Sequence, residues 1–260
     1  MTFRKLATAI AVIGLFATGA ANADVYPDFT IDPSAYAAGK SSFTADKITG
    51  NYAERITFCT VGACAGTFEL SLKWNAGQFS QNEGVDVLGA GTTGLVANYG
   101  LYALFTGVGT FTPTTFTLNN TGSALNVYLD KQNDTSFGSA GVQSSSAFWT
   151  TGNIGDDVLL ATGTAKAGQG NISCNVGNNC GSFGQVTTFG LTNAGKGFFT
   201  GPNPFYDISL QSGQLNGFTP AGTLTINGSM DVIFATPEPT SLALIGLALV
   251  GVAASRRRKA

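Results

Sequence analysis

The chain has 260 residues, of which 13 are Lys or Arg, 15 are Asp or Glu and none is His, giving a formal net charge of −2 at pH 7. The absence of histidine excludes the Ser-His-Asp triad, the Cys-His pair and His-ligated metals as sources of activity. The two terminal segments hold six of the cations and one of the acids, so the body between them has a net charge of −7, which argues against a nucleic-acid partner.

The first residues have the organisation of a secretory signal peptide. Arg4 and Lys5 precede an apolar run over residues 6–16, and Ala21 and Ala23 supply the small side chains found before a cleavage site. An apolar run of this length is too short for a transmembrane helix. The sequence therefore predicts cleavage after Ala23 and export of the body.

The exported body is predicted to be all β. It is rich in Gly, Thr, Ser and Asn, which favour strands and turns. Apolar and polar residues alternate from Phe68 to Trp74, from Tyr206 to Leu210 and from Leu224 to Phe234. Weaker strands are predicted at residues 52–58, 101–105, 114–118, 125–129, 158–162 and 186–191. About nine short strands, separated by Gly-rich or Asn-rich breaks, favour a two-sheet antiparallel sandwich of jelly-roll type.

The four cysteines form two close pairs along the chain, Cys59 with Cys64 and Cys174 with Cys180. Cysteines of an exported protein are expected to oxidise, and proximity favours these two pairs among the three possible pairings. Such small rings each remove about 2 kcal/mol of unfolded-state entropy, so they stiffen loops more than they hold the fold. A zinc site is the alternative, but thiolates in an oxidising compartment with no histidine beside them are poor candidates for it.

Two acidic clusters are candidates for metal binding. Asp130, Asn133 and Asp134 follow the strand predicted at 125–129, and Asp156 and Asp157 precede the strand predicted at 158–162. Hard oxygen ligands on a loop can hold Ca²⁺, which stiffens secreted β domains. The spacing matches no EF-hand, however, and Asp and Asn in turns usually cap their own backbone. A calcium site at the first cluster and simple backbone capping are therefore the two hypotheses, and no other cofactor is predicted.

Aromatic residues offer a possible carbohydrate-binding face. Trp149 follows a polar stretch, where its large ring could stack on a sugar. A Trp buried at a strand edge is the commoner outcome. The sequence is compatible with both environments for Trp149.

Carboxylates are the catalytic groups that a chain without histidine retains. A retaining glycosidase needs two carboxylates about 5 Å apart. The body has only three glutamates, Glu54, Glu69 and Glu83, and none lies in the Glu-x-Asp-x-x-Glu pattern of jelly-roll glycosidases. The sequence therefore favours a non-catalytic protein, with a secreted carbohydrate-binding module or a carboxylate-dependent glycoside hydrolase as the alternative.

The C-terminal segment combines three elements in a fixed order. A hinge, Pro237-Glu238-Pro239, precedes an uncharged apolar run over residues 241–254. Four consecutive cations follow: Arg256, Arg257, Arg258 and Lys259. The apolar run makes only about 21 Å of helix against roughly 30 Å of hydrocarbon, but a buried core helix does not end in four cations, and their long stems can snorkel while the bilayer thins. The segment therefore predicts a single transmembrane helix with its cationic tail on the cytoplasmic side.

These C-terminal elements resemble the PEP-CTERM sorting signal of Gram-negative bacteria that make exopolysaccharide. The tripeptide, the Leu-, Ala- and Gly-rich run and the cations together cover about a tenth of the chain. The resemblance implies recognition by an exosortase-type membrane peptidase, an inner-membrane intermediate held by the helix, and delivery to the cell surface or extracellular matrix. A sorting signal does not say what its cargo does.

The body itself resembles the flocculation-associated branch of PEP-CTERM proteins, in the stretches 24–29, 73–79 and 205–214. This second resemblance rests on no chemical motif. It implies an exported, non-catalytic surface or matrix protein that contributes to flocculation or biofilm together with secreted polysaccharide. The predicted organisation is a signal peptide (1–23), a β-sandwich body (24–235) and a PEP-CTERM sorting and anchor segment (236–260).

Overall fold

The structure is a computed structural model. It describes residues 26–112, 115–139, 148–166, 174–175, 179–180, 183–212 and 221–235, with the backbone alone at 174–175, 179–180, 183–185, 211–212 and 235. The predicted signal peptide, its cleavage site and the sorting and anchor segment therefore lie outside the described residues.

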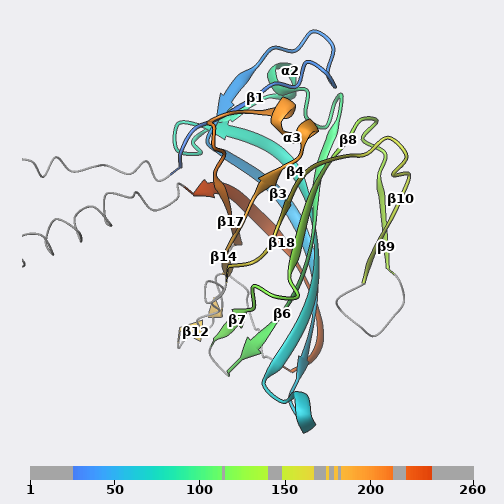
Figure 1. Cartoon of the computed structure of the whole chain (residues 1–260), viewed down its shortest axis with the longest axis vertical. Coiled ribbons are helices and arrows are strands. Elements are labelled where there is room, and N and C mark those ends of the chain that lie inside the picture. The colour runs from blue at the N-terminus through green and yellow to red at the C-terminus, as the bar shows by residue number, and fades with distance from the viewer. Residues whose placement is uncertain are drawn as a thin grey trace, which may run out of the picture.

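One antiparallel sheet forms most of the body (Figure 1). Its strand order is β14 (Phe183–Thr187), β17 (Asp207–Ser212), β18 (Gly222–Ala235), β3 (Lys47–Cys59), β4 (Thr67–Gln81), β6 (Gly100–Phe111), β8 (Ala124–Asp130), β11 (Val158–Gly163) and β15 (Gly190–Leu191). Two short strands pair beside this path, β5 (Asp86–Leu88) on β4 and β7 (Phe116–Leu118) on β6. The long central strands twist, so the sheet curls around its inner face and shields that face from solvent.

Backbone hydrogen bonds join β14, at one end of this strand order, to the segment that follows β11 near the other end. The amide of Lys166 donates to the carbonyl of Val186 (3.1 Å), and the amide of Thr188 donates to the carbonyl of Thr164 (2.9 Å). The segment that follows β11 therefore runs antiparallel to the end of β14. This pairing satisfies backbone groups that an open sheet edge at β14 would leave exposed.

Smaller elements cover the ends and the outside of the curled sheet (Figure 1). They are the sheet of β16 (Phe199–Gly201), β1 (Phe29–Ile31) and β2 (Phe43–Ala45), the hairpin of β9 (Ser136–Ser139) and β10 (Trp149–Gly152), the pair β12 (Cys174–Asn175) and β13 (Asn179–Cys180), the helices α2 (Ala90–Thr93) and α3 (Asn193–Phe198), and a 3₁₀ turn at Gly62–Cys64. The β1 sheet and the two helices close one end, while the β9–β10 hairpin stands along the outer face.

Neither helix of the described residues has the length and hydrophobicity that crossing a membrane would require.

The all-β, antiparallel class predicted from the sequence is confirmed, but the two-sheet jelly roll is not. The strands from β3 to β11 form one ladder instead of two facing sheets. The physical reason lies in strand length, because β3, β4 and β18 run for 13, 15 and 14 residues and pair along nearly their whole lengths. Twist accumulated over strands this long curls the sheet back on itself, so one sheet encloses the core.

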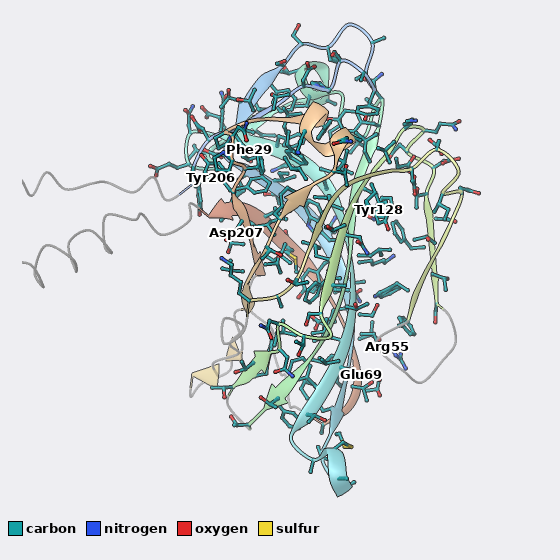
Figure 2. The ribbon with its side chains drawn as sticks, viewed as in Figure 1. Phe29, Arg55, Glu69, Tyr128, Tyr206 and Asp207 are labelled. Atoms are coloured by element: carbon teal, nitrogen blue, oxygen red, sulfur yellow. A yellow bond between two sulfur atoms is a disulfide. The ribbon has the colours of Figure 1, made fainter. Side chains whose placement is uncertain are left out.

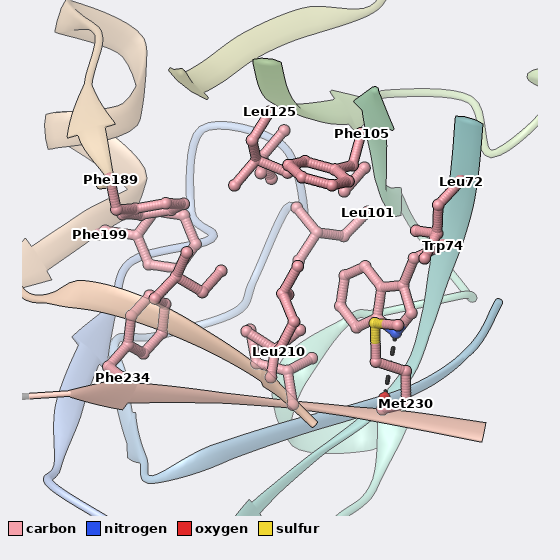
Figure 3. A pocket seen from close by; sticks show the side chains of 15 residues that line it. Leu72, Trp74, Leu101, Phe105, Leu125, Phe189, Phe199, Leu210, Met230 and Phe234 are labelled. Atoms are coloured by element: carbon pink, nitrogen blue, oxygen red, sulfur yellow. Dashed lines mark hydrogen bonds between the residues drawn. The ribbon is translucent and has the colours of Figure 1, made fainter. Parts of the chain in front are cut away.

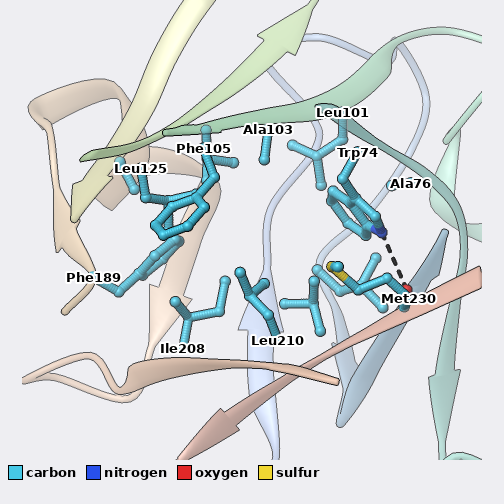
Figure 4. Packing of buried hydrophobic residues seen from close by; sticks show 14 of the residues in the cluster. Trp74, Ala76, Leu101, Ala103, Phe105, Leu125, Phe189, Ile208, Leu210 and Met230 are labelled. Atoms are coloured by element: carbon cyan, nitrogen blue, oxygen red, sulfur yellow. Dashed lines mark hydrogen bonds between the residues drawn. The ribbon is translucent and has the colours of Figure 1, made fainter. Parts of the chain in front are cut away.

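The inner face of the curled sheet carries the core. The four apolar residues of the Phe68–Trp74 alternation are all buried, as their period predicts. A bulge at Gly77 in the β3–β4 ladder then reverses the alternation, so Ala76 and Phe79 are both buried although they lie three residues apart. Residues from β6, β8, β17 and β18 complete this packing (Figure 4).

Aromatic rings fill the closed end of this core. The ring of Phe234 lies 4.6 Å from that of Phe29 and 4.9 Å from that of Phe205, measured between centroids, in edge-to-face geometry. Phe189 and Phe199 pack on the same ring at 5.3 and 5.9 Å. The cavity beside them has a volume of about 20 Å³ and is lined by apolar side chains (Figure 3). A space this small, without polar partners for even one water, is a packing void.

One carboxyl group lies on this apolar inner face. Glu54 of β3 sits between Leu72 of β4 and Ile226 of β18 in the strand register. Its side chain is only 6% exposed, and this burial raises the pKa of the carboxyl to about 7. Glu54 is therefore mostly protonated in the folded protein under mildly acidic conditions.

Candidate metal centre and the outer face

The two acidic clusters of the sequence meet in space. Strands β8 and β11 pair antiparallel, with Leu129 opposite Val158. Asp130 follows the first of these residues and Asp156 precedes the second, so the register brings both to the same end of the ladder. Carboxylate oxygens of Asp130, Asp134 and Asp156 lie within 4.8 Å of one another. The structure thus joins two of the predicted calcium ligands to a third residue from the second cluster.

Asp130 is already engaged with the backbone of its own turn. It is 3% exposed, and its two oxygens accept hydrogen bonds from the amides of Gln132 (3.1 Å) and Thr135 (2.7 Å). Asn133, the third predicted ligand, has a φ of 54° and donates its side-chain amide to the carbonyl of Val96 (2.9 Å). The two Asp130 contacts are the backbone capping that the sequence offered as the alternative to calcium, whereas the Asn133 contact reaches a distant loop.

Asp134 accepts a hydrogen bond from its own backbone amide, whereas Asp156 is incompletely satisfied. Oδ2 of Asp156 is buried and has no hydrogen-bond partner among the described residues. The pKa of the exposed Asp134 is raised, first by loss of hydration and then by the negative charges of Asp156 and Asp130. Like charges at this spacing repel, and a divalent cation would remove the repulsion. The donor set therefore fits a hard cation such as Ca²⁺, held by Asp130, Asp134 and Asp156.

Asp157 anchors the cluster to the outer face of the main sheet. Its carboxylate accepts hydrogen bonds from the Tyr102 hydroxyl and from the Thr135 hydroxyl, the latter at 2.9 Å. Tyr102 stacks on Tyr128, its direct partner across β6 and β8, with ring centroids 5.0 Å apart. Burial and the neighbouring Asp157 raise the pKa of both tyrosines. Both hydroxyls therefore stay protonated at neutral pH, and that of Tyr102 remains a donor.

The β9–β10 hairpin is attached to the same outer face by aromatic and cationic contacts. Trp149 donates its indole N–H to the carbonyl of Ser71 (2.9 Å), and the ammonium of Lys73 lies 4.8 Å from the ring centroids of both Trp149 and Phe137. Partial burial lowers the pKa of Lys73. Sugar stacking by Trp149 stays a prediction, but the structure gives its half-buried ring a second role in holding the hairpin.

Arg55 makes a related contact nearby on the outer face (Figure 2). Its guanidinium lies 4.4 Å from the ring centroid of Phe148. Cation–π contacts were not predicted from the sequence, because neither strand alternation nor composition indicates which ring will lie over which cation.

The Cys59–Cys64 disulfide predicted from the sequence is present, and it closes the turn between β3 and β4 with a Cα–Cα distance of 5.7 Å. For the second pair, the backbone places Cys174 directly opposite Cys180 in the β12–β13 ladder. The side chains of this pair lie outside the described ones, so their linkage stays a prediction.

Comparisons with known proteins bear on the segment after β18. The family model described as the PEP-CTERM protein-sorting motif matches residues 235–259. Residues 235–259 are a PEP-CTERM sorting motif. It begins at the last residue of β18, so it follows the folded body directly. The PEP-CTERM motif indicates export, a membrane-anchored intermediate and exosortase-dependent sorting to the surface. Comparison of the chain with curated proteins and with solved structures gave no match.

Proposed function

We propose that this protein is a non-catalytic component of the extracellular matrix that contributes to flocculation or biofilm by associating with secreted polysaccharide. The observation that carries the proposal is the PEP-CTERM motif placed directly after a folded all-β body. This arrangement supports a function that the body carries out after its display outside the cell. An exosortase-type peptidase, which the motif implies, acts on the tail.

The chemistry of the body supports weak association with many sugar hydroxyls. Exposed positions on β18 are Thr223, Thr225, Asn227 and Ser229, and Thr57 on β3 pairs with Thr223 through their hydroxyls (3.0 Å). Each hydroxyl or amide contact with a sugar contributes only about 0.5 to 1.5 kcal/mol net. Adhesion would therefore need many copies of the protein displayed together, which surface sorting provides.

A deletion strain tests this function. Removing the gene should disperse flocs or biofilm while leaving the amount of secreted polysaccharide unchanged. Complementation with the intact chain should restore aggregation. Complementation with a Pro237→Ala, Pro239→Ala chain, which folds the same body but lacks the sorting tripeptide, should leave the protein in the cell envelope and the flocs dispersed. Normal aggregation of the deletion strain would show that the proposal is wrong.

A second candidate property, calcium binding, is favoured by the buried and unpartnered Oδ2 of Asp156. Calcium held by Asp130, Asp134 and Asp156 would join the turn after β8 to the segment before β11 and stiffen the outer face. Addition of Ca²⁺ to metal-free protein should raise the melting temperature by several degrees, because a ligand that binds only the folded state stabilises it. Asp156→Asn should remove this shift, whereas Glu83→Gln, in an exposed turn, should keep it. An equal response of both variants would exclude the site.

The rival function is a carboxylate-dependent glycoside hydrolase. It is favoured by the close spacing of Asp134 and Asp156 and by the raised pKa of Asp134, which are features of a catalytic acid. Purified protein incubated with the secreted polysaccharide should release no reducing ends if the body is non-catalytic. Release that disappears in Asp134→Asn would establish the hydrolase instead.

A further inference from the structure

A cleft at the closed end of the body has the features of a small-ligand site. Its volume is about 420 Å³, within the range of natural ligand pockets. Helix α3, strand β16 and the loop that leads into β17 form its walls. It is distinct from the acidic cluster and from the hairpin face that holds Trp149, and it shares only Phe189 and Phe199 with the lining of the 20 Å³ void in the core.

An aromatic surface forms the apolar side of this cleft. Phe205 is half-buried, and its ring rests on Phe199 at 5.3 Å and on Phe189 at 5.8 Å between centroids. Tyr206, labelled in Figure 2, donates its hydroxyl to the carbonyl of Asp28 (3.1 Å), which ties the loop to the chain before β1. The exposed part of the Phe205 ring is therefore held in place before any ligand arrives.

The polar side of the cleft contains one cation and two neutral groups. Lys196 comes from the last turn of α3, while Thr200 and Asn203 come from β16 and the loop after it. No acidic residue is among the described residues that line the cleft. Lys196 is exposed, and its ammonium makes no hydrogen bond or ion pair with a described residue. The free ammonium attracts an anionic group at short range, where salt screens the more distant acids of a body whose net charge is −7.

The position of Lys196 is fixed by the packing of α3 on β11. Thr192 caps the helix, because its hydroxyl oxygen accepts from the amide of Gly195 (3.0 Å), and the same hydroxyl donates to the carbonyl of Leu159 (2.7 Å). A Cβ at Gly195 would lie 1.9 Å from the carbonyl oxygen of Leu160, so only glycine permits this close approach. These contacts therefore fix the backbone of α3, and with it the Cα position of Lys196, against β11.

We propose that this cleft binds a carboxylate-bearing sugar, a hexuronate unit of a polysaccharide. The C–H face of the pyranose lies on the Phe205 ring, the carboxylate pairs with the Lys196 ammonium, and Thr200 and Asn203 bond ring hydroxyls. An aromatic floor without the cation would suit a neutral sugar, and the cation without the ring would suit any small anion. Their combination in one cleft selects a charged sugar. The inference rests on the proposed function in taking polysaccharide as the partner.

Titration calorimetry of the exported protein tests the inference with two matched probes. Trigalacturonate presents the carboxylates, and its full methyl ester presents the same sugar ring without charge. Trigalacturonate should bind, and the ester should bind at least about tenfold more weakly. Lys196→Ala should weaken trigalacturonate binding about tenfold and leave the ester unaffected, whereas Lys131→Ala, an equal charge change at an exposed position after β8, should change neither by more than about twofold.

A further variant examines the aromatic floor. Phe205→Leu keeps apolar volume beside Phe199 but loses the ring face, so it should weaken both probes to a similar extent. Equal affinity for the two probes, no binding of either, or full affinity in Lys196→Ala would overturn the inference. Flocculation is a separate readout for the proposed matrix function. If Lys196→Ala changes neither trigalacturonate binding nor flocculation, the proposed cleft site is wrong and the matrix function still stands.

Discussion

The two faces of the main sheet are built from the same strands and have opposite chemistry. Inward positions of β3 and β4 carry apolar side chains around a void of about 20 Å³, with Glu54 as a buried acid among them. Outward positions of the same strands carry Arg55 and Lys73, which aromatic rings from the β9–β10 hairpin cover. Burial of apolar area makes the inner face the source of stability, while the outer face and the cleft at the closed end of the body retain the polar groups that a ligand needs.

The largest expected difference between the faces is in the stability lost when each of the two tryptophans is replaced by alanine. Trp74 is 3% exposed and donates its indole N–H to the carbonyl of Met230 (3.1 Å). Trp74→Ala should lower the free energy of unfolding by about 3 to 5 kcal/mol, measured by urea denaturation, because it opens a cavity and removes a buried hydrogen bond. Trp149→Ala, on the outer face, should cost no more than about half as much. Equal losses would mean that the hairpin is part of the core.

The next largest effect concerns the buried acid. Burial raises the pKa of Glu54 from 4.5 to about 7, so the folded protein keeps a proton that the unfolded chain releases. Stability from this group is therefore full below about pH 4.5 and falls as the pH rises through about 7. Glu54→Gln should change stability little near pH 4 and increase it by about 3 kcal/mol near pH 9.

Urea midpoints at several pH values provide the measurement for Glu54. Glu83→Gln, the same substitution in an exposed turn, is the matched control and should show no such pH dependence. If Glu54→Gln lowers stability at high pH, the carboxyl has a stabilising partner and the inner face is not apolar around it.

A smaller effect is expected where the outer face holds the acidic cluster. Tyr102→Phe removes the hydrogen bond from the Tyr102 hydroxyl to Asp157 and should cost about 2 kcal/mol at neutral pH, because bonds to charged groups are worth more than neutral ones. Tyr128→Phe keeps the ring stack and should cost clearly less. Thermal unfolding of both variants checks this difference, and equal costs would show that the bond from Tyr102 to Asp157 adds no stability of its own.

The smallest expected effect is at the hairpin. Trp149→Phe keeps a ring beside Lys73 but loses the hydrogen bond to the Ser71 carbonyl, at a cost of about 1 kcal/mol. The loss should be local, so amide exchange should accelerate in β9 and β10 and stay unchanged in β3 and β4. Acceleration throughout the main sheet would show that the two faces unfold as one unit.

Local sequence pattern was enough to determine the class of the body and several of its features. Alternation, strict in Phe68–Trp74 and less regular in the β18 region, predicts strands with one buried face, since successive side chains in a strand point to opposite sides. The Cys59–Cys64 disulfide follows from proximity along the chain. The sorting motif at 235–259 is likewise recognisable because its three elements are contiguous.

Only the tertiary structure decided what depends on pairing between distant segments. The β8–β11 register brings Asp156 to Asp130 and Asp134, and no spacing in the sequence states that register. Glu54 occupies an inward position whose apolar neighbours, Leu72 and Ile226, come from two other strands. Two facing sheets were predicted, but one sheet curls around the core because twist accumulates over its long paired strands. The cleft with Lys196 and Phe205 forms only at the closed end of that sheet.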